Sequence, residues 1–149
     1  MTGVQTCALP ICQHDDRFDG DPSVDGILQI DGYGGRDVLD LSTASWPQSV
    51  YLGPDMPSYS LWAIGIAVVI GSDKNDHLVF ASGDVRAQFR GRKGDDTLIG
   101  GPLDDVLTGG PGNDTLRGKG GNDRIDGQDG TDTCDGGAGV NSITRCELH

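Results

Sequence analysis

The clearest pattern of apolar and polar positions lies in residues 91–144. Written nine residues to a block, this stretch reads GRKGDDTLI, GGPLDDVLT, GGPGNDTLR, GKGGNDRID, GQDGTDTCD and GGAGVNSIT. Each block ends in three residues, and the middle one, at position eight, is the residue expected to point into the core. Such alternation predicts a very short strand with one buried side chain. The eighth-position residues are Leu98, Leu107, Leu116, Ile125, Cys134 and Ile143.

The first six residues of each block predict a turn. Glycine opens every block, and glycine permits the positive φ angles that Asp and Asn also tolerate. A strand and a turn repeated at a fixed period predict a chain that coils on itself, with half a coil in each block. Every second block then stacks on the one before it. The apolar residues therefore form ladders, and the turns form two columns.

Position six is acidic in five of the six blocks. Stacking would bring these carboxylates close to one another, where they repel unless a cation lies between them. Calcium suits such a place because it accepts six to eight oxygen ligands in flexible geometry, from carboxylates and backbone carbonyls alike. The sixth-position residues are Asp96, Asp105, Asp114, Asp123, Asp132 and, in the last block, Asn141. A disordered Gly/Asp-rich tract is the alternative, but it would not require an aliphatic residue at every ninth position.

The blocks resemble the RTX, or hemolysin-type, calcium-binding nonapeptide repeat, and GGPGNDTLR matches the repeat pattern throughout. The resemblance implies an all-β fold, a parallel β-roll or solenoid, with Ca²⁺ held between turns by the sixth-position residues and turn carbonyls. One column would place calcium between Asp96 and Asp114 and between Asp114 and Asp132. The other would pair Asp105 with Asp123.

In that second column the resemblance also pairs Asp123 with Asn141, a neutral ligand. The chain departs from the family pattern at Leu103, which stands where the fourth-position glycine is expected. These two departures weaken the expectation of calcium at Asp105 and at Asn141. Residues 91–149 are thus expected to form a calcium-binding β-roll.

Residues 13–90 predict a degenerate β-helical segment of the same kind. Asp37 and Asp76 occupy the sixth positions of two imperfect blocks, 32–40 and 71–79, and are further candidate calcium ligands. Lys74 replaces the fourth-position glycine beside Asp76, which makes that site less certain. The apolar run 63–70 predicts one buried strand, since it falls well short of the ~20 residues that span a bilayer.

The first residues need separate treatment. Residues 1–11, MTGVQTCALPI, are identical to the translation of a common short-read sequencing adapter. We therefore expect residues 1–12 to be adapter-derived, disordered and outside the fold. The segment upstream of residue 13 in the natural protein is then missing from this chain.

Charge narrows the classes of function. The formal net charge is −12, with 23 acidic and 11 basic residues, which argues against a nucleic-acid partner. Glu147 is the only Glu, and a short carboxylate such as Asp is the acid that suits a turn. Neither an H-E-x-x-H nor a G-x-S-x-G motif occurs, so this chain is not expected to be an enzyme.

Two cysteines near the end predict a disulfide cap. Cys134 is an inward eighth-position residue, and Cys146 follows twelve residues later, so a stacked roll would bring them near each other. Two reduced thiols, with Cys134 as a small core residue, are the alternative. A disulfide indicates an oxidising, extracellular setting, where calcium is abundant.

Together these features predict a secreted calcium-binding module that folds when it binds Ca²⁺. Its partner, if it has a protein or surface partner, is not indicated by the sequence. The alternative is that the chain forms the C-terminal module of a secreted hydrolase, a metalloprotease or a lipase, whose catalytic domain lies upstream.

Overall fold

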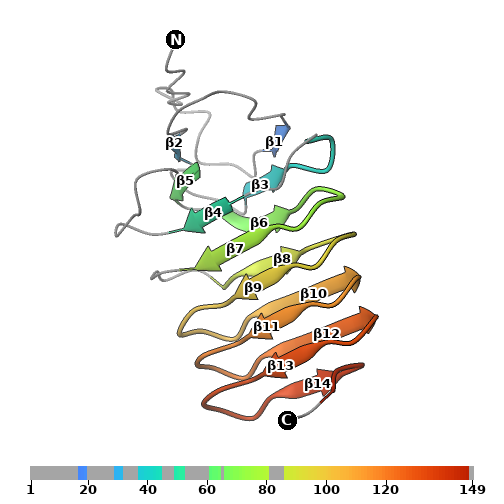
Figure 1. The fold of residues 1–149 in the computed structure, drawn as a ribbon. Helices are drawn as coiled ribbons and strands as arrows, with labels where there is room; N and C mark the ends of the chain where they lie inside the picture. Colours follow the sequence, from blue (N-terminus) through green and yellow to red (C-terminus); the bar gives the residue numbers. More distant parts are fainter. Residues whose placement is uncertain are drawn as a thin grey trace.

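The computed structural model describes residues 17–19, 29–31, 37–44, 49–52, 61–64, 66–80 and 86–147. These ranges form strands and turns and contain no helix (Figure 1). The strands are β1 (Arg17–Asp19), β2 (Gln29–Asp31), β3 (Asp37–Asp40), β4 (Ser49–Leu52), β5 (Leu61–Ile64), β6 (Ile66–Ile70), β7 (His77–Phe80), β8 (Gln88–Arg90), β9 (Thr97–Ile99), β10 (Val106–Pro111), β11 (Thr115–Arg117), β12 (Arg124–Asp129), β13 (Thr133–Asp135) and β14 (Ser142–Thr144).

The strands form two seven-stranded sheets in which the paired strands are parallel. One sheet has the order β1-β3-β6-β8-β10-β12-β14, and the other has the order β13-β11-β9-β7-β4-β5-β2. From β6 onward, successive strands alternate between the two sheets, so two strands and two turns complete one coil (Figure 1). The expected fold class, an all-β parallel β-roll, is confirmed.

The apolar residues at position eight form the predicted ladders. Leu98 pairs with Leu116, and Leu116 pairs with Cys134, along one sheet. Leu107 pairs with Ile125 in the other sheet, as expected for blocks that stack two by two. Five of these side chains are entirely buried or nearly so: Leu98, Leu107, Leu116, Ile125 and Cys134. From β9 to β13 the core is therefore a thin spine between the two sheets, with one apolar side chain per strand.

The same spine continues toward the N-terminus. Phe89 on β8 pairs with Leu107 and is fully buried, and Leu78 on β7 pairs with Leu98 and is fully buried as well. Both sheets thus run across residue 90 without interruption. The degenerate segment 13–90 and its boundary at residue 90 remain predictions. The adapter-like residues 1–12 lie outside the described ranges.

Two details differ from the sequence prediction. The apolar run 63–70 is not one strand, because it is divided between β5 and β6, which belong to opposite sheets. The coil allows only three to six residues in any strand, so a longer apolar run has to contribute to both sheets. In addition, β10 and β12 extend into the following turn, where Gly110 pairs with Gln128 and Pro111 with Asp129.

None of the described ranges provides a helix that could cross a membrane.

The spine makes a stability prediction. Leu116 is fully buried between Leu98 and Cys134, so Leu116→Ala should lower the free energy of unfolding by about 2–5 kcal/mol, measured by urea denaturation with calcium present. Val140, which is 84% exposed, offers the control, and Val140→Ala should change stability by less than about 0.5 kcal/mol. Equal losses in both variants would contradict an inward eighth position.

Candidate metal centre

The sixth-position residues stand in two columns at the starts of strands. Asp96, Asp114 and Asp132 directly precede β9, β11 and β13, which are neighbours in one sheet. The remaining members precede β10, β12 and β14 in the other sheet, and they are Asp105, Asp123 and Asn141. All five aspartates are at most 2% exposed, although each lies in a turn. The two rows predicted from the nine-residue period are therefore present.

One oxygen of each carboxylate links neighbouring coils. In the first column the Asp96 amide donates to Asp114 Oδ1 at 2.8 Å, and the Asp114 amide donates to Asp132 Oδ1 at 2.8 Å. The Asp76 amide donates in the same way to Asp96 Oδ1, at 2.7 Å. Each side chain thus reaches back to the coil before it, and this bond sets the separation of the stacked turns.

The second column repeats this arrangement. The Asp105 amide donates to Asp123 Oδ1 at 2.8 Å, and the Asp123 amide donates to Asn141 Oδ1 at 2.8 Å. At its start the Ala87 amide donates to Asp105 Oδ1 at 2.7 Å. Asn141 thus shows that a neutral amide oxygen can take over the linking role, because only one oxygen is required for it.

The second carboxylate oxygen is the unusual one. Among the described residues, the buried Oδ2 atoms of Asp96, Asp114, Asp123 and Asp132 have no hydrogen-bond partner. A buried carboxylate oxygen without a partner costs free energy, and such groups in proteins are normally paired or bound to a metal. Four such atoms, one per turn, indicate a ligand that the protein chain does not itself supply.

Backbone carbonyls lie next to these oxygens. A Cβ atom placed on Gly109 would collide with Asp114 Oδ2 and lie 2.8 Å from the carbonyl oxygen of Gly127. A Cβ on Gly91 would similarly meet Asp96 Oδ2 and the Gly109 carbonyl oxygen, the latter at 2.8 Å. From the block of Gly71 to that of Gly127, the first-position glycine therefore lets a carboxylate oxygen and a carbonyl oxygen of the next coil approach the backbone more closely than a Cβ would allow.

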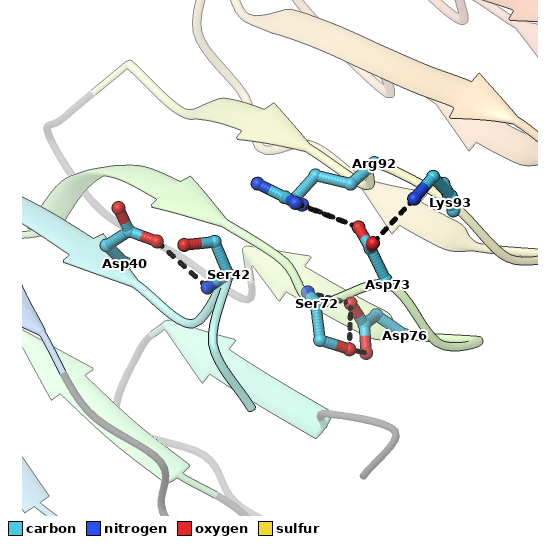
Figure 2. A network of polar contacts seen from close by, with 7 residues as sticks. All are labelled: Asp40, Ser42, Ser72, Asp73, Asp76, Arg92 and Lys93. Atoms are coloured by element: carbon cyan, nitrogen blue, oxygen red, sulfur yellow. Dashed lines mark hydrogen bonds and ion pairs between the residues drawn. The ribbon is translucent and has the colours of Figure 1, made fainter. Parts of the chain in front are cut away.

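Two turns differ from this arrangement. At Asp105, the Gly101 amide donates to Oδ2 at 2.6 Å, and at Asp76 the Ser72 amide donates to Oδ2 at 2.6 Å. The Ser72 hydroxyl adds a hydrogen bond of 2.9 Å to Asp76 Oδ1, as Figure 2 shows. In both turns the amide at position two therefore satisfies the oxygen that is unpartnered elsewhere.

The fourth position separates the two kinds of turn. Gly94, Gly112, Gly121 and Gly130 have positive φ, and each precedes by two residues an aspartate whose Oδ2 has no partner. Lys74 and Leu103 occupy the same position before Asp76 and Asp105, and neither has positive φ. Position two differs in the same way, because Arg92, Gly110, Lys119 and Gln128 have positive φ in the four turns with a glycine at position four, whereas Ser72 and Gly101 do not. The two remaining turns therefore take a different path. We call the four glycine-bearing turns open and the other two closed.

Electrostatics in the first column favour a cation. Burial raises the pKa of the Asp96 carboxyl to about 8, and the nearby charges of Asp76 and Asp114 add to the effect. Burial likewise raises the pKa of Asp114 to about 6, with Asp132 contributing. Burial raises the pKa of Asp105 and of Asp123 as well. A divalent cation would reverse this cost, since an opposite charge stabilises the ionised form.

The donor set fits calcium. Each open turn offers carboxylate and carbonyl oxygens and no sulfur or nitrogen donor among the atoms described above, which is the chemistry of a hard cation. Within the described ranges, no three His, Cys, Asp or Glu side chains gather into a metal-binding group. A cation in these turns would thus rely on backbone carbonyls for much of its coordination, as the abundance of glycine permits.

The remaining predicted residues have different positions. Asp37 is the first residue of β3, where the pairing with β6 is irregular, and its side chain lies outside the described part. Asp76 lies in a closed turn and therefore differs from the four open ones. Cys134 and Cys146 form the predicted disulfide, with their Cα atoms 5.8 Å apart.

The sequence analysis missed a second ladder at position five. The Asn113 amide donates to Asp95 Oδ1 at 2.8 Å, and the Thr131 amide donates to Asn113 Oδ1 at 3.0 Å. The other column has the same bonds from Asn122 to Asp104 and from Val140 to Asn122, both 2.8 Å. These side chains reach forward, whereas those at position six reach back. The recurring Asn or Asp at position five was the available signal.

Charged side chains on the outside also join successive coils. Asp73 pairs with Arg92 at 2.9 Å and with Lys93 at 2.8 Å (Figure 2). Arg86 pairs with Asp104 at 3.2 Å, and Arg145 pairs with Asp126. These pairs are exposed or partly exposed, so each contributes little to stability. They place the few basic residues outside the buried columns.

Comparison with known families agrees with this geometry. The family model described as the RTX calcium-binding nonapeptide repeat matches residues 88–107 and 108–143, with four copies. These residues contain all four open turns. No curated protein matches the chain. Residues 88–143 are therefore RTX calcium-binding nonapeptide repeats, and this part of the chain belongs to that family.

Proposed function

We propose that this chain is a secreted calcium-binding module whose β-roll folds as it binds Ca²⁺, and that its role is binding rather than catalysis. The observation that carries the proposal is the row of buried carboxylate oxygens without partners at Asp96, Asp114, Asp123 and Asp132. Each of these oxygens lies close to a first-position glycine, and a backbone carbonyl oxygen of the next coil approaches the same glycine.

The coupling of binding to folding rests on the position of these carboxylates. In the unfolded chain they are solvated and far apart, whereas in the roll they are buried and stacked. Burying an unpaired charge is costly, and a bound cation removes most of that cost. A ligand that binds the folded state and not the unfolded state stabilises folding, so calcium should shift the equilibrium toward the roll.

The disulfide and the concentration of calcium both support an extracellular setting. The disulfide between Cys134 and Cys146 is of a kind that persists in oxidising compartments. Calcium in such compartments reaches millimolar concentrations at which even weak sites fill. A chain of this composition would then remain unfolded before export and fold afterwards.

The open turns define where calcium is held. We assign calcium to the turns of Asp96, Asp114 and Asp123, each sharing the ion with the residue that follows in its column. Asn141 contributes as the partner at the end of the second column, whereas the closed turn of Asp105 holds no ion of its own. The closed turn at Asp76 gives the least support for a bound ion, because Ser72 satisfies its carboxylate.

Circular dichroism tests the proposed function. With a chelator the full chain should give a spectrum of unordered polypeptide, and added calcium should produce a β-sheet spectrum. Asp114→Asn should shift the transition to higher calcium concentration, because the amide keeps the linking hydrogen bond, as Asn141 does, but removes the charge. Asp129→Asn, which removes one exposed charge, is the matched control. Spectra that do not respond to calcium would refute metal-driven folding.

The fourth position offers a gain-of-function test. Leu103→Gly should allow positive φ, release the Gly101 amide from Asp105 Oδ2 and open this turn. Isothermal titration calorimetry should then count one more calcium ion per chain than in the wild type. Leu103→Ala is the control, because it removes nearly the same side chain and still disfavours positive φ. Equal ion counts in the two variants would overturn the distinction between open and closed turns.

Protons should compete with calcium. Since the pKa values of Asp96 and Asp114 rise to about 8 and about 6 from an ordinary 3.8, the folded metal-free state binds more protons than the unfolded state over that interval. Without calcium, the sheet content should therefore rise as pH falls from about 8 to about 4, while calcium affinity should fall over the same window.

Two variants check this pH dependence. Asp96→Asn should weaken it, because the amide does not titrate. Asp73→Asn should leave it intact in this window, because hydrogen bonds from Lys93 and Arg92 hold the pKa of Asp73 below its ordinary value. Sheet content is followed by circular dichroism and affinity by calorimetry. A calcium affinity that is constant between pH 8 and pH 5 would contradict the competition.

A further inference from the structure

After the sixth block the sequence leaves the nine-residue pattern, because Arg145 stands where glycine opens every earlier block. Among the described residues, no sixth-position residue of a further block follows Asp132 in the first column. The Asp132 amide nevertheless donates to a carboxylate oxygen, and the acceptor is Glu147 Oε2. Glu147, the only Glu, thus occupies the linking role that Asp114 and Asp132 fill for the coils before it.

One residue combines two roles at this end. In the regular repeats, the amide at position seven donates to the preceding sixth-position carbonyl, as from Thr133 to Asp114 at 2.8 Å. The Glu147 amide makes the equivalent bond to the Asp132 carbonyl, also at 2.8 Å, and Glu147 pairs with Thr133 as a bridge. The backbone of Glu147 therefore takes the place of a seventh-position residue. Its side chain accepts the hydrogen bond that a sixth-position side chain accepts in the regular repeats. Glu has one methylene more than Asp, and this extra length lets its carboxylate reach the Asp132 amide from one residue further along the chain.

At this end of the roll, a residue outside the repeats also supplies the carbonyl oxygen that lies next to the first-position glycine. A Cβ atom on Gly127 would collide with both Asp132 Oδ2 and the carbonyl oxygen of Arg145. Arg145 thus supplies the oxygen that Gly109 and Gly127 supply in the two preceding coils. Arg145 has a φ of +52°, and its guanidinium is held by Asp126, which fixes the residue in this unusual conformation.

The Asp132 side chain points to a ligand independently of these replacements. Asp132 is 1% exposed, and its Oδ2 has no hydrogen-bond partner. The disulfide from Cys134 to Cys146 holds the residue between Arg145 and Glu147 against the core spine. A buried carboxylate oxygen, a carbonyl and a second carboxylate are thereby brought to one turn by a segment that the family model does not cover.

We propose that residues 145–147 complete a further calcium site with Asp132, in which the Arg145 carbonyl and the Glu147 carboxylate take the places that a glycine carbonyl and a sixth-position carboxylate hold in the regular repeats. The inference rests on the proposed calcium binding by the repeats and adds one site to it. The disulfide then positions the ligands of this site in addition to tying the segment to the core.

The test uses the full, disulfide-bonded chain and calcium chloride in isothermal titration calorimetry. Glu147→Gln keeps an acceptor for the Asp132 amide and removes only the charge. It should weaken one calcium site by roughly tenfold or more, since loss of an outer-shell partner alone typically costs 10- to 100-fold. Asp129→Asn, which removes one negative charge at the same end of the roll, should leave the ion count and affinities unchanged.

The outcomes separate this inference from the proposed function. Loss of one tight ion in Glu147→Gln, with the wild-type count retained in Asp129→Asn, supports the terminal site. An unchanged count and affinity in Glu147→Gln, in a chain that otherwise binds calcium, overturns it and leaves Glu147 as a hydrogen-bonding cap. A wild-type chain that binds no calcium refutes the proposed function itself. If Glu147→Gln proves unstable, Glu147→Asp provides a second test, because the shorter side chain keeps the charge but should no longer reach the Asp132 turn, so the terminal ion should again be lost.

Discussion

A buried carboxylate with one hydrogen-bonded oxygen and one unpartnered oxygen is the interaction on which this structure depends. The hydrogen-bonded oxygen fixes the spacing of the coils, because each sixth-position side chain accepts the amide of the coil before it. The unpartnered oxygen carries the cost, since desolvation penalises the charge and neighbouring carboxylates repel it. The most regular feature of the roll is thus a set of buried carboxylates that a bound cation would stabilise. A core that is one side chain thick on each strand has little apolar burial with which to offset that cost.

The glycines have distinct roles in this design. At the first position, the missing Cβ lets Asp114 Oδ2 and the Gly127 carbonyl approach the backbone of Gly109. At the fourth position, glycine has positive φ in the four turns whose second-position amide leaves the carboxylate oxygen without a partner, and the second-position residues of these turns have positive φ as well. Where Leu103 removes that freedom, the amide of Gly101 satisfies Asp105 instead. The backbone therefore decides between binding a metal and satisfying the carboxylate internally.

The end of the roll shows how a repeat can stop without leaving its last layer incomplete. A regular coil would need a full turn after Thr144, but residues 145–147 supply the carbonyl, the amide and the carboxylate in a shorter path. The disulfide from Cys146 to Cys134 ties this path to the spine and covers Ile143, which is only partly buried. Solenoids commonly need atypical terminal units to protect their exposed ends. Here the disulfide at Cys146 and the hydrogen-bonding carboxylate of Glu147 lie on adjacent residues.

The sequence by itself determined the repeat, the inward residues at position eight and the two columns at position six. These follow from a nine-residue period, because glycine-rich turns and single inward side chains leave one way to stack. It also indicated the disulfide, since a stacked roll would bring Cys134 and Cys146 near each other, with two reduced thiols as the alternative. The sequence marked the turns of Asp105 and Asp76 as departures through Leu103 and Lys74, but only the tertiary structure showed that a second-position amide satisfies the carboxylate in these turns. The tertiary structure alone revealed the role of Glu147 as well, since this residue breaks the period and gains its position from the fold of the chain around Asp132.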